Sequence, residues 1–136
     1  MSGNLGMGVM LSILGGNKET VEAHLKAQGK TISEISFSEE SLILKFSDGT
    51  GIKIFDDGQS CCENRYMTTN DDIQSFVGSK FLNAEIREAP NAPYEYGEHE
   101  VQFLLINTDK GTFAIETHNE HNGYYGGFAI AIEEIE

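Results

Sequence analysis

Alternating apolar and polar positions dominate the chain, and this two-residue period is typical of half-buried β-strands. Residues 42–46 alternate most cleanly, and residues 52–54 repeat the pattern after a Ser-Asp-Gly-Thr stretch at 47–50. A short polar stretch that contains Asp-Gly between two alternating runs predicts a β-hairpin. Residues 32–37 are more loosely patterned, and we expect them to form a strand that joins the hairpin in a meander.

The second half of the chain predicts further strands. Residues 80–88 form one, and residues 101–107 and 112–117 form a hairpin across a Thr-Asp-Lys-Gly turn. Residues 128–132 carry alternating apolar side chains and predict a last strand. Residues 59–68 follow no clear period, so we expect them to be extended or irregular.

Helix signals are fewer than strand signals. Asn17 is a suitable cap for a helix over residues 17–28, and a glycine follows that helix. Thr69 or Asn70 is a suitable cap for a second helix, over residues 71–77. Together these elements predict an α+β fold with one mainly antiparallel β-sheet and two or three short helices.

Residues 1–16 differ from the rest of the chain in being apolar and rich in glycine. No lysine or arginine precedes Lys18, so we expect no signal peptide. The stretch is also shorter than the roughly 20 residues that a membrane-spanning helix needs. It either packs on the core or mediates self-association, because exposed apolar patches usually mark interfaces. We expect residues 17–136 to form a single α+β domain.

The net charge narrows the functional classes. The chain has 136 residues, a length that suits one domain, and its 22 acidic and 9 basic residues give a net charge of −13. Proteins that bind DNA, RNA or an anionic membrane depend on basic contacts to phosphate, so we expect none of these partners. A small anion can still bind through a few local donors. An acidic surface can also mimic DNA, which leaves a protein-binding inhibitor as an alternative.

The polar, glycine-rich run at residues 118–128 is the first candidate for a site. It follows a predicted strand and precedes another, where a tight turn needs only about two residues. Amides suit a base edge or a ribose, tyrosine rings stack on planar groups, and glycines let a ligand approach the backbone. A long polar hairpin with an ordinary Asn-Gly turn is the alternative. The members that we expect to contact a ligand are His118, Asn119, Asn122, Gly123, Tyr124 and Tyr125.

The adjacent Cys61 and Cys62 and the nearby Arg65 form the second candidate. Neighbouring cysteines pair only in a strained ring, so we expect two free thiols, which suit a reducing cytosol. A thiol next to His118 is a conceivable nucleophile, but a free cysteine commonly packs in the core as a small apolar side chain. Arg65 and Arg87 are candidate phosphate contacts, because guanidinium groups match phosphate oxygens.

Metal binding is disfavoured by the spacing of the histidines. On an extended chain, His118 and Glu120 share one face, whereas His121 points to the other. No second cluster has the paired spacing of a zinc site. We therefore expect neither a metal nor another cofactor.

The order and spacing of these motifs resemble a known family. Cys61-Cys62-Glu63 after a strand, a short helix, a Lys110-Gly111 hairpin and Asn122-Gly123-Tyr124-Tyr125 before a last strand are similar to the first type of Thoeris anti-defence sponges, which are proteins of phages that infect bacteria. The similarity extends over roughly residues 42–132. Residues 1–16, His118 and His121 depart from the pattern.

The resemblance implies a specific function. In Thoeris defence, a TIR enzyme converts NAD into a cyclic ADP-ribose isomer that activates a lethal effector, and the sponge binds this signal without degrading it. Some sponges of this type also bind cyclic trinucleotides at a separate pocket, as higher oligomers. The resemblance thus implies a non-enzymatic protein in the cytoplasm of the infected bacterium, acting as a homodimer or larger homo-oligomer. It carries over the Cys61-Cys62 segment and Asn122 with its flanking Gly-Tyr-Tyr.

The implied ligand has parts that the candidate residues suit. Arginines and glycine N–H groups bind phosphates, amides bind ribose hydroxyls, and aromatic rings stack on adenine. An acidic inhibitor of a host defence enzyme remains an alternative, as does a small phosphodiesterase or cysteine hydrolase. The sponge interpretation assigns the phosphates to Arg65 or Arg87, the riboses to Asn119 and Asn122, and the adenine to Phe113, Tyr124 or Tyr125.

Overall fold

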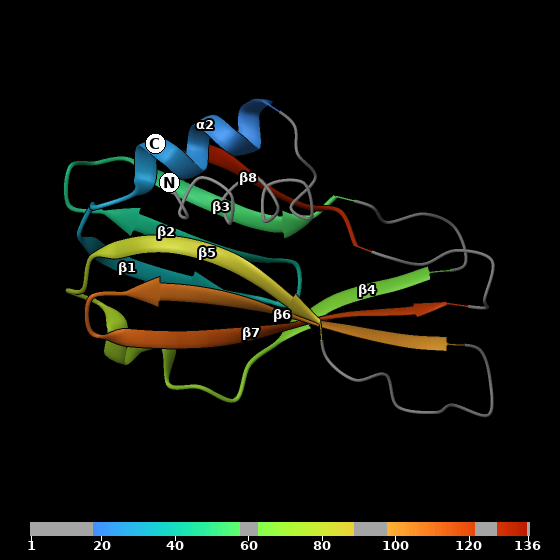
Figure 1. Ribbon diagram of the computed structural model, residues 1–136. Helices are drawn as coiled ribbons and strands as arrows, with labels where there is room; N and C mark the ends of the chain where they lie inside the picture. Colours follow the sequence, from blue (N-terminus) through green and yellow to red (C-terminus); the bar gives the residue numbers. More distant parts are fainter. Residues whose placement is uncertain (1–17, 58–62, 89–97, 122–127, 136) are drawn as a thin grey trace.

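Figure 1 shows the fold in the computed structural model, which describes residues 18–57, 63–88, 98–121 and 128–135. These residues form one α-helix, one 3-10 helix and eight β-strands. The predicted α+β class, mainly antiparallel, is confirmed. In chain order the elements are α2 (Lys18–Ala27), β1 (Ile32–Phe37), β2 (Ser41–Phe46), β3 (Gly51–Asp56), β4 (Glu63–Thr68), η1 (Ile73–Phe76), β5 (Phe81–Glu88), β6 (Glu98–Thr108), β7 (Gly111–His121) and β8 (Ile130–Ile135).

The strands form two four-stranded sheets, and the prediction of one sheet is wrong. The first sheet has the order β1-β2-β3-β8 and the second has the order β4-β7-β6-β5, with every pair antiparallel. Alternation along a strand indicates that one face is buried, but it does not identify the partner strand. The chain leaves the first sheet after β3 and returns to it only in β8.

Both sheets contribute alternate side chains to one hydrophobic core. Burial of each such side chain contributes roughly 1.5–3 kcal/mol, so this shared core is the main source of stability. Residues that are essentially inaccessible to solvent include Leu42, Leu44, Ile52 and Ile54 of the first sheet and Leu104, Ile106, Phe113 and Ile115 of the second.

Helix α2 covers one edge of each sheet. β8 and β5 are edge strands, and an edge strand has backbone groups without a partner strand. Ile132 of β8 donates its backbone N–H to Oγ1 of Thr20 at 3.2 Å, and Ala84 of β5 donates its backbone N–H to Nε2 of His24 at 3.0 Å. Thr20 and His24 lie one helical turn apart, so a single face of α2 hydrogen-bonds to both edge strands. Figure 1 shows α2 running along β8.

His24 is a buried, neutral histidine. Its side chain packs edge-on against Phe81, with ring centroids 5.8 Å apart. Burial, which disfavours the charged ring, lowers the pKa of His24 from 6.5 to about 4. Nε2 accepts a hydrogen bond, so the proton of the neutral ring lies on Nδ1.

The second predicted helix is shorter than expected. Residues 71–77 contain a single 3-10 turn, Ile73–Phe76, and no side-chain cap bond precedes it. Thr69, one of the two expected caps, binds the neighbouring strand β7 instead, where its Oγ1 donates to the carbonyl of Ala114 at 2.7 Å. Asp71 binds the same residue and accepts the backbone N–H of Ala114 at 2.7 Å. These two hydrogen bonds occupy the backbone groups of Ala114, which lies outside the part of β7 that pairs with β4.

Strands β4 and β7 are longer than the sequence indicated. We expected residues 59–68 to be extended or irregular, and Glu63–Thr68 forms a regular strand. We expected β7 to end at Thr117, but it continues to His121 because β4 pairs with it along residues 116–121. The first four residues of the polar run are therefore strand rather than loop. Among the described residues, no helix has the length and apolar character needed to cross a membrane.

Candidate functional site

The pairing of β4 with β7 brings together the two candidate segments of the sequence. Glu63 lies opposite His121, and Arg65 lies opposite Asn119, although the members of each pair are more than 50 residues apart in the chain. Glu98 of β6 also lies opposite His121. We call this end of the second sheet, residues 63–65, 98–100 and 119–121, the distal end. It projects beyond the first sheet at the right of Figure 1.

The interior face of the second sheet becomes polar toward the distal end. Ile115 is followed on the same face by Thr117, which is 1% exposed, and by Asn119, which is 0% exposed. Thr117 donates its hydroxyl to the backbone carbonyl of Gln102, which lies opposite it. The side-chain oxygen of Gln102 is buried without a hydrogen-bond partner among the described residues. The buried amide oxygen of Gln102 can accept a hydrogen bond from a polar ligand.

Arg65 and Asp56 form a buried ion pair beside these amides. Nη1 of Arg65 lies 2.8 Å and 3.0 Å from the two carboxylate oxygens of Asp56, and both side chains are 8% exposed. Asp56 also accepts the backbone N–H of Ala129 at 3.2 Å. The carboxylate therefore joins the end of β3, strand β4 and the residue before β8. Loss of one partner of a buried ion pair typically costs about 3–5 kcal/mol, because the other charge stays buried.

A cavity of about 370 Å³ opens beside this ion pair. Its volume lies within the range of roughly 300–1,000 Å³ that is typical of small-molecule sites. Met67, Ser41 and the side chains of Arg65 and Asp56 are its buried walls, whereas Glu39 and Glu40 are exposed at its mouth. The complete lining is Glu39, Glu40, Ser41, Lys53, Phe55, Asp56, Arg65, Tyr66 and Met67.

The opposite face of β4 and β7 carries a second group of side chains. The rings of Tyr66 and His118 stack with centroids 4.5 Å apart and an interplanar angle of 5°. The Tyr66 hydroxyl donates to Glu120, and Nε2 of His118 lies 2.9 Å from Oγ1 of Thr68. These contacts hold the side chain of Tyr66, a residue that also lines the cavity.

The predicted site residues fall into three groups. Arg65 and Asn119 lie together at the interior of the distal end. Arg87, Phe113 and His118 lie elsewhere: Arg87 is exposed on β5 and pairs with Glu85 at 2.8 Å, Phe113 is 1% exposed in the core, and His118 lies on the other face of β7 from Asn119. The predicted residues Cys61, Cys62, Asn122, Gly123, Tyr124 and Tyr125 lie outside the described residues.

Phe113 has little ring surface to offer a ligand. Its ring packs against Phe76, with centroids 4.9 Å apart. An adenine could stack on Phe113 only if the core opened, which would cost several kcal/mol. In the part of the chain that the structure describes, no group of three His, Cys, Asp or Glu side chains is placed to hold a metal ion.

Several residues of the site carried no signal in the sequence. Asp56 precedes Asp57 and Gly58, a sequence typical of an ordinary turn, yet it is the partner of Arg65. Lys53 and Phe55 belong to β3, and nothing in a strand pattern indicates that the outward face of that strand borders a cavity. Their roles depend on the position of β4, which is a long-range pairing.

The family model described as a domain of unknown function (DUF7448) matches residues 26–130. The chain belongs to this family. The DUF7448 region includes every residue that lines the cavity, as well as Asn119, but it begins after Thr20 and His24. No curated protein matches the chain, and no solved structure matches it either.

Proposed function

We propose that the protein binds a cyclic nucleotide signal, a cyclic ADP-ribose isomer or a cyclic oligonucleotide, and sequesters it without degrading it. The observation that carries the proposal is the register of β4 and β7, which places Arg65 and Asn119 opposite each other, buried and next to a cavity of ligand size. Glu63, which belongs to the Cys-Cys-Glu motif of the resemblance, is the first residue of β4 and lies opposite His121 at this same end of the sheet.

The chemistry of this end of the sheet supports a polar, phosphate-containing ligand. A guanidinium group matches phosphate oxygens, and an amide can both donate to and accept from ribose hydroxyls. Arg65 is the better candidate phosphate contact of the two arginines, because Arg87 is exposed on the outer face of β5. Sequestration needs tight binding rather than a reacting group, and nanomolar affinity corresponds to about −12 kcal/mol.

Thermal unfolding in the presence of candidate signals tests this function. Binding at about 100 times Kd stabilises the folded state by roughly 2.7 kcal/mol, so a clear rise in Tm is expected with at least one cyclic ADP-ribose isomer or cyclic trinucleotide. Heating the complex should release that nucleotide intact. No shift with any of them would refute the proposal, and recovery of a cleaved product would favour a phosphodiesterase instead.

A matched pair of arginine variants examines the site itself. Arg65→Lys keeps the charge but removes the planar fork, so we expect the nucleotide affinity to fall at least tenfold. Arg87→Lys makes the same change at an exposed position and should leave the affinity within about twofold of the wild type. Isothermal titration calorimetry measures both, and equal losses in the two variants would contradict the assignment to Arg65.

The proposal extends to a homodimer or larger homo-oligomer in the host cytoplasm. A pocket completed by a second subunit would bury more of a polar ligand than one chain can. Light scattering coupled to size-exclusion chromatography measures the mass in solution. A monomer that nevertheless binds the nucleotide tightly would refute the oligomer and leave the binding function intact.

A further inference from the structure

We infer that the 370 Å³ cavity holds the uncharged nucleoside part of the ligand. This inference rests on the proposed function and assigns one part of the ligand to one place in the fold. The cavity adjoins the proposed phosphate contact, because Arg65 is one of its lining residues.

The charges around the cavity favour an uncharged group with hydrogen-bond donors. The charge of Arg65 is matched by Asp56, which binds it through both oxygens. The remaining lining charges are the two carboxylates of Glu39 and Glu40 and the single ammonium group of Lys53. A phosphate at this mouth would face a net negative charge, whereas ribose hydroxyls and base N–H groups can donate to the carboxylates.

The rings around the cavity suit a planar base. Phe55 and Tyr66 both line it, and both are partly exposed. Tyr66 is held in place by its stack on His118, so its position is fixed before a ligand arrives. Nζ of Lys53 lies 5.1 Å from the centroid of the Phe55 ring, at the distance of a cation–π contact. Met67, which is 2% exposed, provides an apolar floor.

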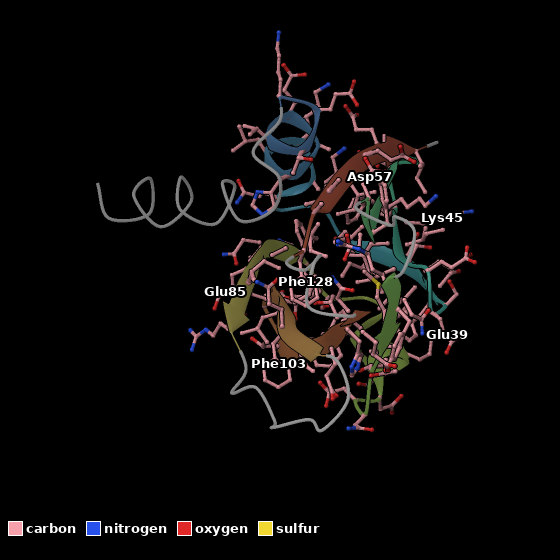
Figure 2. All side chains as sticks on the ribbon, turned by 90° about the vertical axis from the view of Figure 1, so that its right-hand side faces the viewer. Glu39, Lys45, Asp57, Glu85, Phe103 and Phe128 are labelled. Carbon is pink, nitrogen blue, oxygen red and sulfur yellow. The ribbon has the colours of Figure 1, made fainter. Side chains whose placement is uncertain are left out.

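A pair of phenylalanine variants tests the cavity. Phe55→Leu removes a ring from the lining, and Phe103→Leu removes a partly exposed ring from the second sheet, away from Glu39 in Figure 2. Adenosine, which has no phosphate, is the probe. We expect it to bind the wild type weakly and saturably, and Phe55→Leu to weaken binding by about 5- to 150-fold, the range for loss of one base–aromatic stack. Phe103→Leu should bind adenosine like the wild type.

The carboxylates at the mouth are tested in the same way. Glu40→Gln keeps the shape but weakens acceptance of hydrogen bonds, so adenosine affinity should fall several-fold. Glu34→Gln, at an exposed position of β1 outside the cavity, is the control. Both substitutions remove one negative charge, so an equal effect would indicate general electrostatics and contradict the assignment.

The same variants separate this inference from the proposed function. If a cyclic ADP-ribose isomer binds the wild type and Phe55→Leu with equal affinity, the nucleoside site is refuted and the sequestering function stands. If adenosine binds, and Phe55→Leu abolishes this binding, the cavity is a nucleoside site even where no cyclic nucleotide binds. Circular dichroism and Tm of each variant establish that it is folded.

Discussion

His24 and Arg65 are both buried polar side chains, but the free-energy cost of removing them from water is offset in different ways. His24 remains neutral and accepts a backbone N–H, and its low pKa results from its removal from water. Arg65 keeps its charge and is stabilised by Asp56. A buried neutral histidine supports the fold over a limited pH range, whereas a buried arginine stays charged at every pH at which the protein is folded.

The stability of the fold should therefore fall in mild acid. Below pH 6.5 the unfolded chain takes up a proton on His24, whereas the native state does so only near pH 4. The unfolded state then binds more protons, so the free energy of unfolding decreases as the pH falls through this window, by up to about 3 kcal/mol. Urea unfolding at several pH values measures the change.

His24→Gln is the control for this pH effect. Glutamine can still accept a hydrogen bond, but it does not titrate. We expect a variant that is less stable at pH 7 and whose stability changes less between pH 6.5 and pH 4. An unaltered pH dependence in this variant would show that other groups, such as the surface carboxylates, cause the loss.

At the scale of elements, local patterns predicted strands well and their partners poorly. The alternation at residues 42–46 and 52–54 identified β2 and β3, and the turn between them was placed correctly. Residues 63–68 alternate weakly, so they were expected only to be extended or irregular, and they form the regular strand β4 through pairing with β7. The sequence predicted Arg65 and Asn119 as ligand contacts. It could not place them side by side, because their proximity depends on the same long-range pairing of β4 with β7. It gave no indication of Asp56 as the partner of Arg65.

The contribution of the hydrogen bond between α2 and β8 to stability can be tested by replacing the hydroxyl group of Thr20. Thr20→Val keeps the shape of the side chain but removes the oxygen that accepts the N–H of Ile132. A buried N–H without a partner typically costs about 1–3 kcal/mol, so we expect a fall of this size in the free energy of unfolding. Thr20→Ser retains the oxygen and should lose clearly less, and chemical denaturation compares the two.

At the scale of the whole molecule, the charge of −13 opposes the compact state that the shared core favours. The ion pairs at the surface are few and isolated among the described residues, for example Lys26 with Glu134 and Lys30 with Asp48. Pairs of this kind contribute little. Repulsion between carboxylates should therefore affect stability more than attraction within the surface ion pairs does.

Added salt should accordingly stabilise the protein. The screening length falls from about 30 Å at 0.01 M salt to about 8 Å at 0.15 M, which weakens repulsion across the whole surface. We expect the urea midpoint to rise over this range while the m-value stays constant. A midpoint that falls would show that the surface ion pairs outweigh the repulsion.

The position of Thr20 and His24 decides which part of this chain should be expressed in the laboratory. The DUF7448 match begins at residue 26 and ends at residue 130, so it omits both side chains and nearly all of β8. A fragment cut at those boundaries would expose the backbone of β5 and leave β3 without its neighbour. Uncovered strand edges promote aggregation. Expression of this protein should therefore include the residues on both sides of the match.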